Sequence, residues 1–297
     1  VTGVQTCALP IFVRLANPLS EDLPYLRTTL IPGLFEALSR NVSRGADNIS
    51  LFEQGSVYIK TSASKKSIKP KLLKRPSAKE INDLNSILPI QPKMVAAIFS
   101  GEKFQSGWWP NSQKFSWNDP IEMIVKICAE HGISVILKNV KFAPFHPGRC
   151  AEISVGNSII GYAGEFNPSI LEKNGISGKV YGFEINVDLI VNKSQEIQAP
   201  IFSAMPVVKE DFAFVVSKEV TALEMTETIE KSAGDLLESV RLFDVYEGSN
   251  IAEGKKSMAF SLRFRAPDRT LKSEEIAKLR GQIVSAIEKQ YQGSLRA

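Results

Sequence analysis

The feature that most constrains the fold is a strict two-residue alternation near the end of the chain. Between Lys256 and Arg265, every second side chain is large and apolar, namely Met258, Phe260, Leu262 and Phe264. The positions between them are small or basic, namely Ser257, Ala259, Ser261, Arg263 and Arg265. Because successive side chains of a strand point to opposite faces, this segment predicts a strand with one buried face and one exposed face.

The surrounding segments predict a complete domain. Residues 211–217 and 239–246 have strand patterns, and residues 222–233 and 273–291 have helical periodicity. Ser273 is expected to be the N-cap of the last helix. A short Ser-Leu-Arg segment follows it. The resulting order, βαββαβ, is that of the ferredoxin-like fold, so we expect residues 205–297 to form a sheet with two helices on one face and an open second face.

Residues 12–190 predict a larger α+β domain with an antiparallel sheet. An apolar face from Ile31 to Val42 predicts a helix at 31–44, and Asp119-Pro120 predicts the N-cap and first position of another. Six strands are expected, at 49–59, 94–99, 134–140, 151–156, 158–166 and 180–190. A polar stretch with two prolines predicts a linker at 191–204.

Charge is distributed unevenly along the chain. Residues 205–297 carry 14 basic and 15 acidic side chains, whereas residues 1–204 carry 22 and 17. Eight basic residues and no acidic ones lie between Lys60 and Lys79. This run predicts a solvated insertion. Two interpretations remain open for it: a flexible polar linker, or a contact with a phosphate backbone.

Several classes of protein are disfavoured by the sequence. The apolar runs are shorter than the ~18 residues of a membrane helix. The two histidines and three cysteines lack zinc-site spacing, and such unpaired cysteines suit a reducing compartment. Cys128 is expected to pack as a small apolar residue. No phosphate-binding glycine loop is present.

The first eleven residues, VTGVQTCALPI, have neither a helical nor a strand period. They resemble the translation of a DNA-sequencing adapter, so we expect them to be non-native and the native sequence to begin near Phe12, with more of it upstream. The alternative is a native edge strand.

A series of short motifs indicates a family. In chain order they are NPLS, LRTTLIPGL, SLFEQGSVY, HPGRCAEI, GYAGEFNP, YGFEINVDL, FDVYEG, KKSMAF and DRTLKSEE. Together they resemble the C-terminal part of bacterial phenylalanine–tRNA ligase β subunits, over residues 13–297. The resemblance implies a class II aminoacyl-tRNA-synthetase-like core at 12–190, followed by a ferredoxin-fold anticodon-binding domain.

The resemblance also implies which chemistry to expect. In this family the β core is catalytically silent and the active site lies in the α subunit, which uses ATP and magnesium. The stretch 181–190, which matches the third class II motif, contains no arginine to hold ATP phosphate. We therefore expect no catalytic residue, metal or cofactor in this chain, an α2β2 heterotetramer with the α subunit, binding of tRNA(Phe), and a cytoplasmic location. Neither a membrane nor DNA is expected as a partner.

Candidate site residues follow from these patterns. For tRNA binding they are Tyr246, Lys255, Lys256, Arg263, Arg265 and Arg269. The KKSMAF strand carries no stacking aromatic on its exposed face, and the alternative for each arginine is a solvated charge. For the subunit interface or structural motifs they are Arg27, His146, Arg149 and Glu165. The two prolines and the glycine of the stretch 144–149, which ends in HPGR, predict a tight turn, which either binds an anion or only shapes the chain.

Two other functions were weighed against this one. The first is a non-catalytic RNA-binding or regulatory module with a degenerate synthetase core. The second is an autonomous class II enzyme, which the missing arginine disfavours. Association with an α-type partner distinguishes the first alternative, and ATP–pyrophosphate exchange by the isolated chain distinguishes the second.

Overall fold

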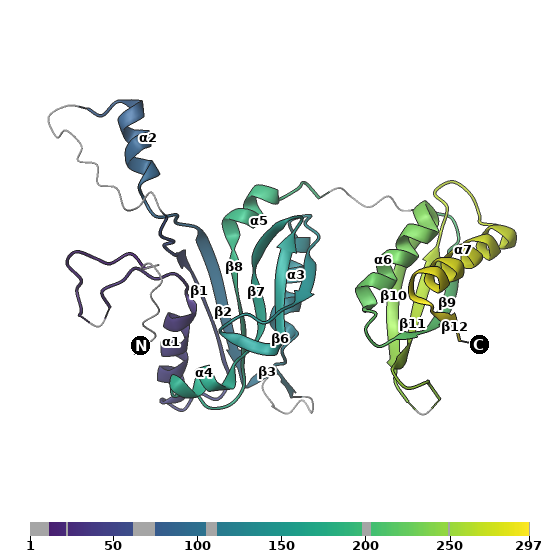
Figure 1. Ribbon diagram of the computed structural model, residues 1–297, viewed down its shortest axis with the longest axis horizontal. Helices are drawn as coiled ribbons and strands as arrows, with labels where there is room; N and C mark the ends of the chain where they lie inside the picture. Colours follow the sequence, from purple (N-terminus) through teal and green to yellow (C-terminus); the bar gives the residue numbers. More distant parts are fainter. Residues whose placement is uncertain are drawn as a thin grey trace. The chain divides into compact units, whose positions relative to one another are not determined.

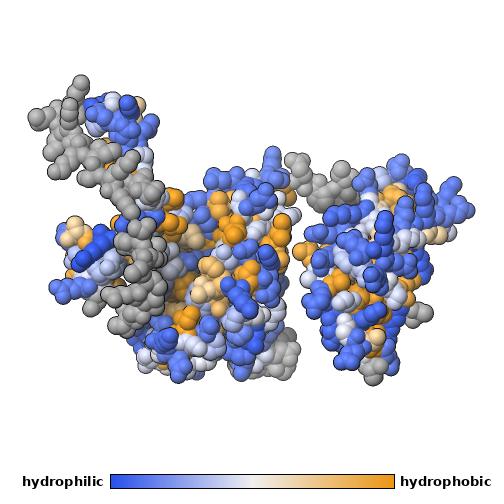
Figure 2. Space-filling view, viewed as in Figure 1, coloured by the Kyte–Doolittle hydropathy of each residue, from blue (hydrophilic) through white to orange (hydrophobic). Residues whose placement is uncertain are grey.

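The computed structural model describes residues 12–21, 23–61, 75–104, 112–197, 203–248 and 250–296. The chain divides into two compact units, residues 1–198 and residues 199–297, which we call the N-terminal and C-terminal units (Figure 1). The expected adapter segment, 1–11, and residues 62–74 of the basic run lie outside the described residues. None of the described helices combines the length and the hydropathy needed to cross a bilayer. The visible face of each unit is mainly hydrophilic, with scattered apolar patches (Figure 2).

The N-terminal unit is built on a six-stranded antiparallel sheet, ordered β1-β2-β8-β7-β6-β5. Its strands are β1 (Ile49–Ser56), β2 (Lys93–Ser100), β5 (Ile136–Asn139), β6 (Phe145–Val155), β7 (Ser158–Phe166) and β8 (Val180–Asn186). The pair β3 (Glu102–Phe104) and β4 (Gln113–Lys114) forms a separate ribbon. The helices are α1 (Ile31–Val42), α2 (Ala78–Ser86), α3 (Asp119–Ala129), α4 (Pro168–Lys173) and α5 (Val187–Lys193).

Helices cover both faces of this sheet. On one face, Phe35 of α1 and Leu171 of α4 pack with Phe166 of β7 in a single apolar cluster. On the other, Ile124 of α3 and Ile190 of α5 belong to a second cluster. The central strand β2 contributes Ala96 and Ile98 to the first cluster and Ala97 and Phe99 to the second. A strand buried on both faces explains the continuous apolar run at 94–99.

The C-terminal unit has the ferredoxin-like arrangement that the alternation predicts. Its antiparallel sheet has the order β10-β11-β9-β12. The elements are β9 (Val208–Ser217), α6 (Ala222–Ala233), the 3₁₀ turn η2 (Gly234–Leu236), β10 (Leu237–Tyr246), β11 (Lys255–Phe264), α7 (Ser273–Tyr291) and β12 (Ser294–Leu295). The four apolar side chains of β11 are fully buried beneath α6 and α7, which confirms the predicted phase of this strand.

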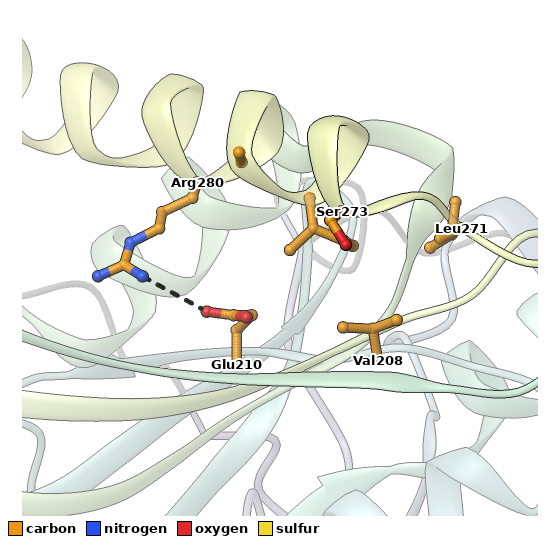
Figure 3. A pocket seen from close by; sticks show the side chains of 7 residues that line it. Val208, Glu210, Leu271, Ser273 and Arg280 are labelled. Carbon is orange, nitrogen blue, oxygen red and sulfur yellow. Dashed lines mark ion pairs between the residues drawn. The ribbon is translucent and has the colours of Figure 1, made fainter.

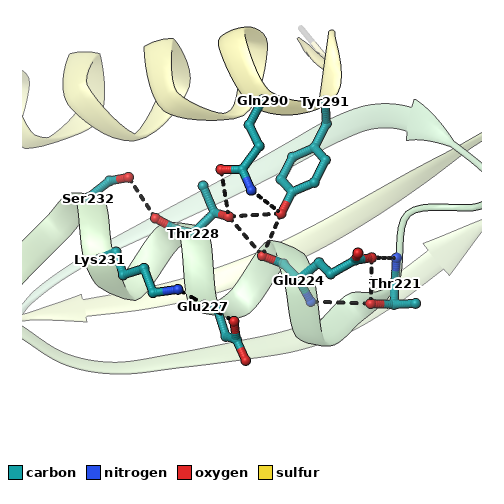
Figure 4. Close-up of polar contacts among 8 residues, drawn as sticks. All are labelled: Thr221, Glu224, Glu227, Thr228, Lys231, Ser232, Gln290 and Tyr291. Carbon is teal, nitrogen blue, oxygen red and sulfur yellow. Dashed lines mark hydrogen bonds and ion pairs between the residues drawn. The ribbon is translucent and has the colours of Figure 1, made fainter. Parts of the chain in front are cut away.

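A polar network joins α6 to α7 above this core (Figure 4). The Thr228 and Tyr291 hydroxyls lie 2.9 Å apart, and the Tyr291 hydroxyl also donates to the carbonyl of Glu224 at 3.0 Å. The Gln290 side-chain amide donates to Tyr291 Oη at 3.0 Å. Because Thr228 is buried, these hydrogen bonds satisfy a hydroxyl that would otherwise destabilise the fold.

Several predicted boundaries are wrong. The segment 180–190 is not one strand: β8 ends at Asn186, whose side chain accepts the Leu189 N–H and begins α5. The last helix begins at Ser273 with Lys272 as N-cap, and the Glu275 carboxylate accepts the Lys272 N–H at 3.0 Å. Asp119 is the first residue of α3 rather than its cap, because its carboxylate reaches back to the N–H and hydroxyl of Ser116.

Helix α2 was not foreseen by the sequence analysis. It is short, buries none of its residues, and begins with a capping box in which Ser77 and Glu80 exchange hydrogen bonds. The Ser-x-x-Glu spacing was a visible sign of a helix start. Helix α2 lies at the end of the basic run. Because it buries none of its residues, no buried face marked this segment as a helix.

Candidate RNA interface

The candidate site is the face of the C-terminal sheet that lies opposite α6 and α7. Strand pairing places its side chains in rows across the sheet. One row joins Ser239, Arg263 and Lys209, and the next joins Arg241, Ser261 and Asp211. Further along, Tyr246 pairs with Ser257, which in turn pairs with Val215. The face therefore has a basic end and an end where small residues lie beside an aromatic ring.

An open groove of about 560 Å³ runs over the basic end. Its lining residues come from three neighbouring strands and are Lys209, Asp211, Ser239, Arg241, Phe243, Ser261 and Arg263. Three cations and one carboxylate line it, so the groove suits an anionic ligand. The phenyl ring of Phe243, half exposed at 54%, adds an apolar surface. Sequence analysis missed Arg241, Phe243 and Lys209, although 209 and 241 fall on the solvent side of the alternation.

The predicted tRNA contacts Arg263, Arg265 and Tyr246 are placed differently from one another. The Arg263 side chain is partly exposed and its Nε donates to Glu238 at 3.0 Å. Arg265 lies beyond the end of β11, mostly buried; it pairs with the same carboxylate and donates to the Ser203 carbonyl at 2.7 Å. Arg265 keeps the parity of the alternation, between the buried residues Phe264 and Ala266, but its side chain is more enclosed than that of Arg263. Tyr246 has the Arg296 guanidinium 5.5 Å from its ring centroid.

The remaining predicted contacts lie around the sheet. Lys255 is exposed at the start of β11, on the same side as Ser257. Lys256 shares the phase of the core residue Met258 and so lies on the helix side. Arg269 forms two hydrogen bonds with Glu275, at 2.6 and 2.7 Å. Its guanidinium, followed by the Lys272 N–H, lowers the pKa of Glu275 to about 2.

A second pocket of about 280 Å³ lies on the helix side of the same sheet (Figure 3). It joins Val208 and Glu210 of β9 to the first turns of α7, and Arg280 spans it toward Glu210, at 3.8 Å. Apolar side chains, the hydroxyl of Ser273 and the ion pair make up its lining. It offers less exposed charge to a nucleic acid than the open groove.

The motif residues of the N-terminal unit are brought together in pairs. Arg27 forms an ion pair with Glu53 and donates to the Ser56 carbonyl at 3.1 Å. Arg149 donates to Glu165 at 2.7 Å. Glu165 is only 3% exposed, whereas the Arg149 side chain reaches solvent.

The predicted turn over residues 144–149 is wrong for most of its length: the Phe145 N–H donates to the Phe142 carbonyl at 2.9 Å, so the turn closes where β6 begins. His146 to Arg149 lie within β6, in an irregular stretch where the pairing with β7 shifts between Phe145 and Cys150. The His146 Nδ1 accepts the Gly148 N–H at 3.1 Å. Because the register skips these residues, the proline that lacks an N–H removes no ladder hydrogen bond.

The two glycines of the GYAGEF motif predict close backbone approach, and the structure confirms it. A Cβ at Gly161 would lie 2.1 Å from the Glu184 carbonyl oxygen, and one at Gly164 would lie 2.0 Å from that of Arg149. Cys128 is fully buried, as expected, and burial raises the pKa of its thiol.

The strand β8, which the family resemblance matches to the third class II motif, carries a carboxylate at its centre. Glu184 accepts the Leu30 N–H and the Thr29 hydroxyl, both at 2.7 Å, and so holds the start of α1. Burial raises the pKa of this carboxyl. On the sheet face opposite α1, apolar residues such as Phe99 and Phe183 pack with Ile124 of α3. On this evidence the described part of the sheet is built for packing.

Comparisons with known proteins agree with this two-part organisation. Residues 8–187 match the family described as the phenylalanyl tRNA synthetase beta chain CLM domain, and residues 203–296 match the ferredoxin-fold anticodon binding domain. The chain is 42% identical to the phenylalanine–tRNA ligase beta subunit of Thermobifida fusca (strain YX), over 92% of this chain and 34% of that protein. The corresponding subunits of Streptomyces avermitilis and Cutibacterium acnes are 39% and 38% identical, each over 96% of this chain and 35% and 34% of theirs.

The chain thus spans about a third of the length of the curated relatives it matches. Both family matches and the relatives lead to the same assignment. The chain belongs to the family of phenylalanine–tRNA ligase β subunits.

Proposed function

We propose that this chain supplies α-subunit docking and tRNA(Phe) binding for the ATP-dependent attachment of phenylalanine to tRNA. The observation that carries the proposal is the open face of the C-terminal sheet, in a domain whose family is described as anticodon binding. Unpaired RNA bases are held by stacking and by arginine contacts on such surfaces. Tyr246, Lys255 and Arg263 are the predicted contacts that this face presents.

The N-terminal unit is proposed to be a catalytically silent scaffold that packs against the α subunit. Its sheet has apolar clusters on both faces, and Glu184 on β8 holds α1. The adenylate-forming site, with ATP and magnesium, belongs in this proposal to the α subunit of a cytoplasmic α2β2 heterotetramer. Arg27, His146, Arg149 and Glu165 keep their predicted role at the interface or in structural motifs.

The experiment uses the chain within the full-length β subunit, coexpressed with its α subunit. We expect the two to purify as a stable complex, and we expect the isolated chain to give no ATP–pyrophosphate exchange. Failure to associate would support the alternative, a free-standing RNA-binding module. Exchange by the isolated chain would restore the autonomous enzyme and contradict the proposal.

Binding of tRNA is tested in the same complex. Replacing both Arg263 and Arg265 with alanine should weaken tRNA(Phe) binding by roughly 1–3 kcal/mol. Because Arg265 donates to the Ser203 carbonyl, the single variants are measured beside the double one. Arg263→Ala is expected to act on affinity and Arg265→Ala on thermal stability as well. Unchanged affinity in the double variant would contradict a role for this end of the sheet.

A further inference from the structure

The basic groove of the C-terminal sheet contains a pair of side chains that are not among the predicted tRNA contacts. Arg241 and Phe243 are neighbours on the same strand, β10, and both line the groove. Resting on the proposed function of this face, we propose that the two form a nucleotide-binding subsite for single-stranded RNA. In this subsite Phe243 stacks on an unpaired base and Arg241 contacts a backbone phosphate.

Arg241 differs from the other arginines near the sheet in its partners. Arg263 and Arg265 share the Glu238 carboxylate, and Arg269 is bound in a two-bond pair with Glu275. Within the described ranges, Arg241 has no hydrogen bond or ion pair. Its guanidinium donors are therefore available to a ligand, and a phosphate is the ligand that their planar geometry matches.

Phe243 is presented to the groove by an irregularity of the strand. Leu242 pairs with Phe260 and Asp244 pairs with Ala259, so Phe243 is an extra residue between two consecutive pairs. Such a bulge re-aims side chains, and here it leaves the phenyl ring on the groove rather than in the core, where Leu242 packs. A lone exposed apolar residue needs no explanation. An exposed ring beside an unpaired guanidinium is the combination that base stacking uses.

The surroundings favour a short unpaired segment over a duplex. The C-terminal 93 residues carry one more acidic than basic side chain, so their overall field does not attract a long phosphate backbone. The attraction for phosphate is confined to the groove, and the Asp211 carboxylate in the lining weakens it further. Bases stacked within a duplex cannot lie on Phe243, whereas those of a loop can.

The test measures binding of tRNA(Phe) to the assembled α–β complex over a range of salt concentrations. Arg241→Ala should weaken binding about ten-fold and lower the slope of log affinity against log salt by about 1, because one phosphate contact is lost. Phe243→Ala should weaken binding about ten-fold with no change of slope. Phe243→Tyr should restore affinity, since it keeps the ring. Arg280→Ala, on the helix side of the sheet, is the matched control and should leave affinity unchanged.

The outcomes separate this subsite from the proposed function. If Arg263→Ala weakens binding while Arg241→Ala and Phe243→Ala do not, the subsite is wrong and the open face remains the tRNA interface. If none of the three weakens binding, both ideas fail. A duplex RNA that competes as well as an unpaired anticodon loop would also contradict the subsite.

Discussion

The two larger sheets of this chain are both antiparallel. Among the described residues, helices cover both faces of the six-stranded sheet and only one face of the four-stranded sheet. The difference determines what happens to polar side chains on each. On the covered sheet, Glu184 and Glu165 are enclosed and each binds a specific donor. On the open sheet, Arg241 and Phe243 face a groove. Covering a sheet turns its polar groups into structural contacts, whereas an open face leaves them for a ligand.

The largest expected effect tests the covered side of the open sheet. Phe260→Ala should lower the free energy of unfolding of the C-terminal unit by about 3–5 kcal/mol, because it leaves a cavity between β11 and the helices. Urea denaturation monitored by circular dichroism measures it. Ser261→Ala, the next residue on the open face, is the control and should change stability little. Equal effects of the two would show that both faces are buried.

The second prediction compares a position on the sheet of the N-terminal unit with a position on the sheet of the C-terminal unit. Gly161→Ala should destabilise the N-terminal unit by about 1–3 kcal/mol, because the new Cβ would meet the carbonyl oxygen of Glu184 and the Ile185 side chain. Ala259→Ser, on the open face, should cost far less. Thermal unfolding of both variants measures the difference. A stable Gly161→Ala variant would mean that β7 and β8 can separate without cost.

The smallest effect is a pH dependence at the edge of the open sheet. The pKa of Glu275 is lowered from 4.5 to about 2, so its stabilising contribution is fully present above pH 4.5 and is lost as the pH falls toward 2. Glu275→Gln lacks this component. Its melting temperature should lie below that of the wild type at pH 7, and the gap should close between pH 4.5 and 2. A gap that stays constant over this range would argue against the pair with Arg269.

Much of the organisation was predictable from local patterns. The alternation in β11 predicted which of its side chains face the core, because residues two apart in a strand lie on the same side of the sheet. The spacing of Leu34, Phe35 and Leu38 predicted α1, and the glycines of GYAGEF predicted close packing of strands. The motif series identified the family. Each of these features depends on residues that are close together in the sequence, or on a residue type, such as glycine, that indicates one particular backbone geometry.

The wrong predictions concern residues whose environment is set by partners that are distant in the sequence. The HPGR stretch has turn-forming residues, yet pairing with β7 on either side of it makes it part of a strand. Arg265 has the right parity for the open face, but its guanidinium is already used by the Ser203 carbonyl and the Glu238 carboxylate. Phe243 has the composition of a core residue, and a bulge against β11 directs it to the groove.

The sequence alone therefore determined the family, the two domains' fold classes and which face of each regular strand is apolar, because hydrophobic periodicity is local. Only the tertiary structure decided which cations are already paired and which remain available. Arg241, Arg263 and Arg269 are chemically alike in the sequence. Glu238 and Glu275 lie beside the second and third of them, and no described residue pairs with the first. The availability of a charge depends on the groups that the fold places within a few ångströms of it, and residue identity does not encode that distance.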